Sequence, residues 1–175
     1  MRYTNPFRGL VVALCMLSPA SAFSHPQDDA SFVPALVKSV LFDPTSYVPA
    51  IVAWESTRLD WQSSQVFFQH GFLEQNPRFT VSGRANSSAV GYAAGNRLIV
   101  TDAVVNLAGS IANNVTERLI ERGLLRRYAA HRTLVRAVGW IERGAVASYV
   151  SYLQSASHLR QWQDNQLSAR QLGYN

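Results

Sequence analysis

Residues 97–122, RLIVTDAVVNLAGSIANNVTERLIER, carry the clearest helical pattern in the chain. Their polar side chains follow one another at steps of three or four residues, which places them on one stripe of a helix. The members of this acidic and polar stripe are Asp102, Asn106, Ser110, Asn113, Glu117 and Glu121. Apolar residues fill most positions between them, and Gly123 is the type of residue that ends a helix. The pattern therefore predicts a helix over 97–122.

A second long helix is expected over 132–157, after a turn through residues 128–131. It carries a basic stripe at helical spacing, formed by Arg132, Arg136 and Arg143. Because a short connection favours antiparallel neighbours, we expect the two stripes to face each other. Three interpretations of the stripes stay open: two solvated helix faces, a partly buried polar seam, or a row that binds a ligand.

A third long helix is predicted over 45–70, N-terminal to the other two. Asp43-Pro44 is typical of a helix start, and Gly71 is the expected stop. Pro49 lies inside this pattern, where a proline removes a backbone hydrogen bond. The helix therefore either kinks there or begins later, at Ser46 or Val48.

The remaining elements are short. Helical spacing also occurs over 31–41 and over 158–172, the latter ending at Gly173. The glycine-rich loop over 77–95 offers a short hairpin, in which Phe79 and Val81 pair with Val90 and Tyr92. Long helices joined by short connections favour an all-α bundle, with residues 31–175 forming one helical domain.

The N-terminus is typical of a secretory signal peptide. Arg2 and Arg8 precede an apolar run over 9–17, and small residues at 18–22 precede a predicted cleavage before Phe23. The apolar run is far shorter than the roughly 20 residues that span a bilayer. Residues 1–22 are therefore expected to be removed on export, and residues 23–30 to form a flexible leader.

Composition excludes several functions. The chain holds 16 basic residues and 11 acidic ones, so removal of Arg2 and Arg8 leaves a net charge of +3. The arginines are spread along the chain, which argues against a nucleic-acid partner. Cys15 is the only cysteine and lies in the predicted signal peptide. A mature chain without cysteine forms no disulfide and no thiolate metal site.

A polar cluster is expected around the end of the predicted helix over 45–70. Asp60 and Ser64 share one helix face, and Gly71 allows the chain to turn so that Glu74 and Asn76 fold back towards the helix. A carboxylate and an amide on such a turn are well suited to capping backbone N–H groups. Capping is therefore the primary role we predict for Glu74 and Asn76.

The same segment carries a resemblance. The spacing Asp60-x-x-Ser63-Ser64, followed by Gly71-x-x-Glu74-x-Asn76-Pro77, resembles a family of small uncharacterised bacterial membrane proteins built from helices. The resemblance implies that these residues belong together, and it implies no activity. The chain departs from the family pattern, because its helix holds Glu55, Arg58 and several glutamines where lipid-facing residues are expected.

No motif assigns a reaction, a cofactor or a metal. His70 and Glu74 are four residues apart, as are Glu117 and Glu121, but no Glu-x-x-His repeat accompanies either pair. No nucleophile elbow, Walker loop or dinucleotide fingerprint occurs. We assign no catalytic residue, although a small envelope hydrolase using Asp60, Glu74 and His131 is one alternative.

Function is therefore predicted only as a class. Charged and amide residues interrupt both helices with apolar runs, over 97–122 and over 132–157, which favours a soluble or peripheral protein. The preferred prediction is an exported envelope protein with a binding or structural role, whose partner is a membrane surface, another envelope protein or a second copy. A membrane-embedded bundle with a polar internal seam is the other alternative.

Overall fold

A computed structural model describes residues 29–174 of the chain, so the predicted signal peptide and residues 23–28 of the predicted leader lie outside the described residues. Four α-helices follow one another: α2 (Asp29–Leu41), α3 (Val48–Gln69), α4 (Tyr92–Arg127) and α5 (Arg132–Leu172). The prediction of an all-α fold is confirmed. Residues 29 and 30 belong to α2 and not to the leader.

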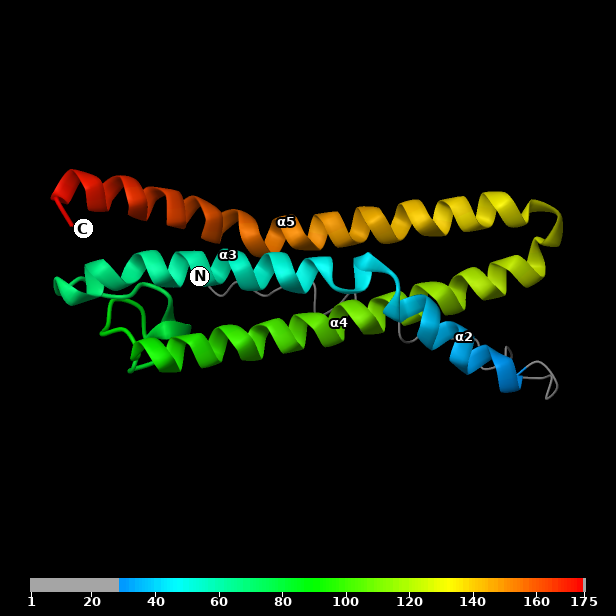
Figure 1. Ribbon diagram of the computed structural model, residues 1–175, viewed down its shortest axis with the longest axis horizontal. Coiled ribbons are helices and arrows are strands. Elements are labelled where there is room, and N and C mark those ends of the chain that lie inside the picture. The colour runs from blue at the N-terminus through cyan, green and yellow to red at the C-terminus, as the bar shows by residue number, and fades with distance from the viewer. Residues whose placement is uncertain (1–28, 175) are drawn as a thin grey trace. The chain divides into compact units, whose positions relative to one another are not determined.

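Three 3-10 turns join or precede the helices: η2 (Pro44–Ser46), η3 (Pro77–Phe79) and η4 (Ala129–His131). Contacts group the chain into two units, Met1–Ala35 and Leu36–Asn175, and α2 continues across the boundary. Within the second unit, α3 packs against both α4 and α5, and α4 packs against α5 (Figure 1). The chain reverses direction between α3 and α4 and again between α4 and α5, so α3 and α5 run parallel.

The predicted bounds of two helices are wrong in an informative way. Gly123 lies inside α4, which continues to Arg127, because a glycine within a helix costs only about 1 kcal/mol relative to alanine. The helices predicted over 132–157 and 158–172 are one helix, because no glycine or proline occurs from residue 145 to residue 172. Gly173 does end α5, with φ of 71° and a hydrogen bond from Tyr174 N to Ala169 O, as in a Schellman cap.

The start and end of α3 follow the local sequence. Asp43 accepts a hydrogen bond from Thr45 N and caps η2, so the Asp43-Pro44 start signal belongs to this short turn. α3 itself begins at Val48, with Pro49 in its first turn, where a missing N–H is harmless. Gly71 follows the helix with φ of 85°, a conformation that suits glycine.

The predicted hairpin in the glycine-rich loop is only partly present. Isolated antiparallel bridges join Glu74 to Ser87 and Thr80 to Ala89, and Val90 N donates to Phe79 O. No strand forms within the described residues. Tyr92, which was expected in the second arm, instead begins α4.

A small aromatic core lies where this loop covers α3 and α4. Trp61, Phe79 and Ile99 are buried together, and Phe68, Ala89, Val90 and Leu98 pack against them. Gly95 lies directly beneath the Trp61 ring, and a Cβ atom at this position would overlap the indole. The absence of a side chain at Gly95 therefore allows α4 to approach α3.

Small residues are buried on both α3 and α5, which pack against each other. Ala50, Ala53 and Ser56 are buried on α3, and Ala147, Ser151 and Ser155 are buried on α5. Each buried serine on these two helices donates its hydroxyl hydrogen to a carbonyl of its own helix, at 2.7 to 3.0 Å. The hydroxyls are thereby satisfied without a partner across the interface.

Large apolar side chains lie mainly on the outside of α4 and α5. Those exposed include Val104, Val105, Leu119, Ile120, Leu124, Leu134, Val138, Trp140, Ile141, Tyr149, Tyr152 and Leu153. By length and composition, α4 is the one helix in the described part of the chain that could cross a membrane, and only 11% of its apolar window is buried.

Candidate functional site

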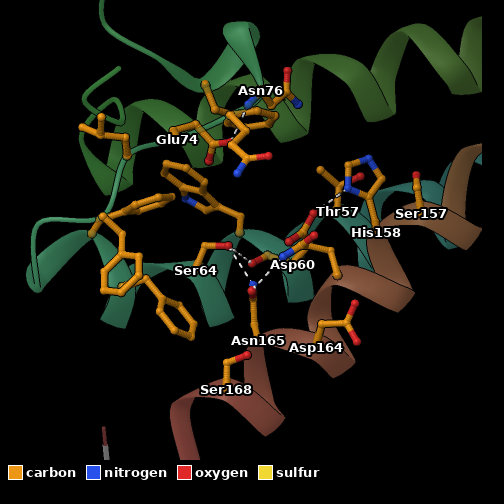
Figure 2. A pocket seen from close by; sticks show the side chains of 18 of the residues that line it. Thr57, Asp60, Ser64, Glu74, Asn76, Ser157, His158, Asp164, Asn165 and Ser168 are labelled. Carbon is orange, nitrogen blue, oxygen red and sulfur yellow. Dashed lines mark hydrogen bonds and ion pairs between the residues drawn. The ribbon is translucent and has the colours of Figure 1, made fainter. Parts of the chain in front are cut away.

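The larger of two cavities lined by the described residues lies between α3, the loop that follows it and the C-terminal half of α5 (Figure 2). Its volume is about 550 Å³, within the range of small-molecule sites. All four residues of the predicted polar cluster line it: Asp60, Ser64, Glu74 and Asn76. The structure thus brings together residues that come from both sides of the Gly71 turn.

A histidine that the sequence analysis did not single out completes the α3 side of the cavity. His158 on α5 contacts Asp60 on α3, with 2.7 Å between Nδ1 and Oδ2. An ionised carboxylate only accepts hydrogen bonds, so it favours a proton on Nδ1. Both side chains are partly buried. The pair joins two parallel helices and places a carboxylate on the cavity wall.

Beside this pair, a buried amide organises the contact between α3 and α5. Asn165 Nδ2 donates to Ser63 Oγ at 3.0 Å and to Ser64 Oγ at 2.9 Å. Both hydroxyls in turn donate to Asp60 O, at 2.9 and 3.0 Å. Asn165 Oδ1 accepts from Gln161 Nε2, so both functional groups of the buried amide have partners.

The loop side of the cavity is made by the predicted caps. Asn76 N donates to Glu74 Oε1 at 2.7 Å, and Asn76 Oδ1 accepts from Arg78 N at 3.1 Å. Asn76 is therefore the cap of η3, as the turn chemistry indicated. Figure 2 shows Glu74 and Asn76 on the opposite side of the cavity from Asn165, with aromatic rings between them.

The rings belong to α3, the loop and η3. Trp61 lies 5.7 Å from Phe68 and 5.1 Å from Phe79, measured between ring centroids. Phe67 meets the edge of Phe72 at 5.5 Å. All five rings line the cavity, so its walls combine aromatic faces with polar groups.

The charge of the cavity is opposite to that of the chain. Its described lining holds three carboxyl groups, on Asp60, Glu74 and Asp164, and one histidine, His158. No lysine or arginine occurs in this lining. The whole sequence carries +5, so an acidic cavity lies in a basic protein.

The predicted stripe on α4 is only partly an interface. Asn106 accepts from Gln154 Nε2 of α5 at 3.1 Å, and Asn113 Nδ2 lies 3.5 Å from Glu117 Oε1. Glu117 is buried. Asp102 instead pairs with Arg78 of the loop. Part of the stripe therefore lies in the contact between α4 and α5, and Asp102 lies outside that contact.

The predicted basic stripe behaves differently, and here the expected pairing is wrong for two residues. Arg132 and Arg136 are exposed, because they lie in the first turns of α5, beyond the acidic positions of α4. Only Arg143 enters the seam, where it is 7% exposed.

Arg143 belongs to an ion-pair network that links α5, α4 and η2. Its Nη1 lies 2.8 Å from Glu121 Oε2, and its Nε lies 3.3 Å from Asp43 Oδ2. Asp43 also pairs with Arg118 of α4. Burial opposes ionisation of Asp43, but hydrogen bonds from Thr45 and the two guanidinium groups outweigh it, so the pKa of Asp43 lies below its usual value.

A second carboxyl group in this region has the opposite shift. Burial raises the pKa of Glu117, and the neighbouring carboxyl of Glu142 raises it further. Asn114, which was not predicted as a site residue, is buried one turn earlier and donates to Thr45 Oγ1 and Ser46 Oγ, each at 2.8 Å. The sequence signal that could have identified Asn114 is its place beside Asn113 in a largely apolar run.

The three residues of the hydrolase alternative do not meet. His131 lines a second cavity of about 280 Å³ between α4 and α5, whereas Asp60 and Glu74 line the larger one. His70 Nδ1 lies 2.7 Å from Val66 O, and its ring stacks on Tyr174. Among the described residues, no three metal-ligating side chains are placed to hold an ion.

Comparison with known proteins adds no name to this site. A scan against models of protein families, and searches of curated proteins and of solved structures, find no match to the chain. The resemblance carried by residues 60–77 therefore stays a prediction.

Proposed function

We propose that this chain is an exported binding protein whose larger cavity takes a ligand with a cationic group on an aromatic or apolar body. The observation that carries the proposal is the combination of Asp60, Glu74 and Asp164 with an aromatic wall and no basic side chain except His158. A cation in the cavity would offset the repulsion among the three carboxylates.

The aromatic wall suits the same ligand. A cation within about 6 Å of a ring centroid is attracted by the negative face of the ring. Trp61 and Phe79 are buried and pack against Phe68, which is only partly buried, so the Phe68 ring is held in place before a ligand enters. Preorganised walls lower the entropic cost of binding.

The polar contacts behind the wall hold the carboxylate in place. His158 positions the Asp60 side chain, and the Ser63 and Ser64 hydroxyls join Asp60 O to Asn165. Because α3 and α5 carry these residues, the site is built on helices and only one side depends on a loop. Export is supported by Arg2, Arg8 and the apolar run over 9–17, and mass spectrometry of the envelope fraction should find a chain that begins at Phe23.

The test compares two probes of one shape, benzamidinium and neutral benzamide, by isothermal titration with the mature chain. We expect benzamidinium to bind and benzamide to bind at least tenfold more weakly. Asp60→Asn should reduce benzamidinium affinity about tenfold or more, since it removes a charge-assisted contact. Asp102→Asn is the matched control, because Asp102 lies on α4 outside the cavity and pairs with Arg78.

Equal affinity for the two probes would overturn the proposal. So would equal losses in Asp60→Asn and Asp102→Asn. Circular dichroism of both variants guards against a folding defect, and a titration of the Trp61 indole N–H resonance shows whether the probe reaches the wall.

A further inference from the structure

The turn between α4 and α5 gathers the strongest charge in the described chain. Between residues 122 and 136 the sequence holds five arginines and no acidic residue. These are Arg122, Arg126, Arg127, Arg132 and Arg136, and the last four are exposed. The arginines, predicted to be spread along the chain, are gathered here because the turn brings two helix ends together (Figure 1).

Large apolar side chains are exposed among these arginines. Leu134 is 63% exposed, Trp140 is 71% exposed and Ile141 is 61% exposed, while Leu124, Tyr128 and Val138 are also exposed. We name residues 122–141 the hairpin tip. Exposed apolar side chains gathered among basic ones are typical of a surface that binds a partner with an apolar interior.

We infer that the hairpin tip docks on an anionic lipid surface, with its arginines at the headgroups and its exposed apolar side chains in the acyl boundary. A basic and apolar helical surface that includes tryptophan has this mode of binding. Trp140 and Tyr128 are residue types that lie well at the boundary between headgroup and acyl chain.

Charge decides between lipid and the other partners. If the hairpin tips of two copies met, five arginines of one copy would face five arginines of the other. Their repulsion argues against dimerisation through this face. Nucleic acid would neutralise the arginines and leave Leu134, Trp140 and Ile141 in water. An anionic lipid surface satisfies both the charge and the apolar area.

The groove between the two helices fits the same interpretation. The second cavity, of about 280 Å³, is lined mainly by apolar side chains, among them Ile120, Leu124, Leu134, Val135 and Val138. Three carboxyl groups, on Glu117, Glu121 and Glu142, also line it. Glu121 is paired with Arg143, so it adds little negative charge towards the membrane. The groove therefore offers space for part of an acyl chain beside the arginines.

The experiment is sedimentation of the mature chain with vesicles of phosphatidylcholine alone and with 30% phosphatidylglycerol. We expect binding to the anionic vesicles that falls steeply between low and high salt, and weak binding to the neutral ones. The double variant Arg127→Gln/Arg132→Gln should lower the partition coefficient more than tenfold, because each basic residue near such a surface contributes roughly fivefold.

The control is Arg160→Gln/Arg170→Gln, which removes the same charge from exposed positions of α5 outside the tip and should change binding less than twofold. Trp140→Ser should weaken binding at high salt, where the apolar contribution remains. Circular dichroism and a thermal melt separate a binding loss from a folding loss. Because the probes are vesicles, this test is independent of the benzamidinium titration.

Three results would overturn the inference: equal binding to neutral and anionic vesicles, equal losses in the two double variants, or a chain that resists extraction by carbonate and leaves membranes only in detergent. The last would show an embedded bundle instead of a docked tip.

Discussion

The two ends of α5 are held to the rest of the bundle in different ways. At the cavity end, hydrogen bonds from Asn165 and the contact of His158 with Asp60 link α5 to α3, while the core of Trp61, Phe79 and Ile99 packs α3 against α4. At the hairpin end, Arg143, Asp43, Glu121 and Arg118 form a network of ion pairs. α5 is therefore held by a few side-chain hydrogen bonds at one end and by a network of ion pairs at the other, and the two ends of the bundle should respond differently to substitution and to pH.

The hairpin end should be the more sensitive to loss of one residue. Arg143→Ala removes a buried guanidinium and leaves Glu121 without this partner, while Asp43 retains Arg118. We expect the free energy of unfolding to fall by about 3–5 kcal/mol, the usual cost of breaking a buried ion pair. Urea unfolding followed by circular dichroism measures this change.

Arg97→Ala, at an exposed position of α4, serves as the control and should cost less than about 0.5 kcal/mol. A loss at Arg143 no larger than this would show that the network contributes nothing to the hairpin end.

The cavity end should fail through packing. Gly95→Ala places a methyl group against the Trp61 ring and should lower the free energy of unfolding by about 1–3 kcal/mol. Gly109→Ala, in the same helix but facing open space, should raise it by about 0.5–1 kcal/mol. Thermal melts of the two variants should therefore move in opposite directions, and shifts of the same sign would contradict the close approach of α4 to Trp61.

The two carboxyl groups of the hairpin end predict opposite pH effects. Because the pKa of Glu117 is raised on folding, its favourable contribution is present at low pH and is lost as pH rises through the folded pKa. Glu117→Gln should therefore stabilise the protein at pH 7, by about 1 kcal/mol, and the gain should vanish below about pH 4. Asp43 has the opposite pH dependence, because its pKa is lowered on folding. Its ionised carboxylate stabilises the fold at pH values above the pKa of the unfolded state, and this contribution is lost as pH falls through the folded pKa.

Melts of Glu117→Gln from pH 7 to pH 3 check the sign. Glu121→Gln, one turn further along α4, is the matched variant and should destabilise at pH 7 because it weakens the pair with Arg143. Destabilisation by Glu117→Gln at neutral pH would contradict the prediction, because it would mean that favourable contacts of the Glu117 carboxylate outweigh its burial and the repulsion from Glu142.

The smallest expected effect concerns the loop over the cavity. Asn76→Ala removes the cap of η3 and should cost about 1 kcal/mol. Gln75→Ala, at the preceding exposed position, should leave the melting temperature unchanged. Equal melting temperatures for the two variants would show that the loop holds its shape without this cap.

How much of this was visible in the sequence depends on distance along the chain. Asp60, Ser64, Glu74 and Asn76 were placed together because a single turn at Gly71 separates them, and local rules describe one turn well. His158 was missed because it lies 98 residues from Asp60, and no local pattern reports a contact between distant helices.

The same limit applies to the helices and the stripes. Helical periodicity predicted that α4 and α5 exist. It did not predict that α4 continues through Gly123, because a glycine can either end a helix or lie within one. The three arginines of the basic stripe do lie at helical spacing, but only Arg143 is buried. The sequence could not show this, because tertiary packing sets the register between two helices.

The serine-lined contact between α3 and α5 has a mechanical consequence. Hydroxyl groups bonded within their own helix offer no directional bond across the contact, and the buried alanines of the two helices have no polar group to offer. The axial position of α5 along α3 therefore depends on a few polar links, chiefly Asp60 with His158 and Asn165 with Ser63 and Ser64. Removal of these links would therefore allow α5 to shift along α3.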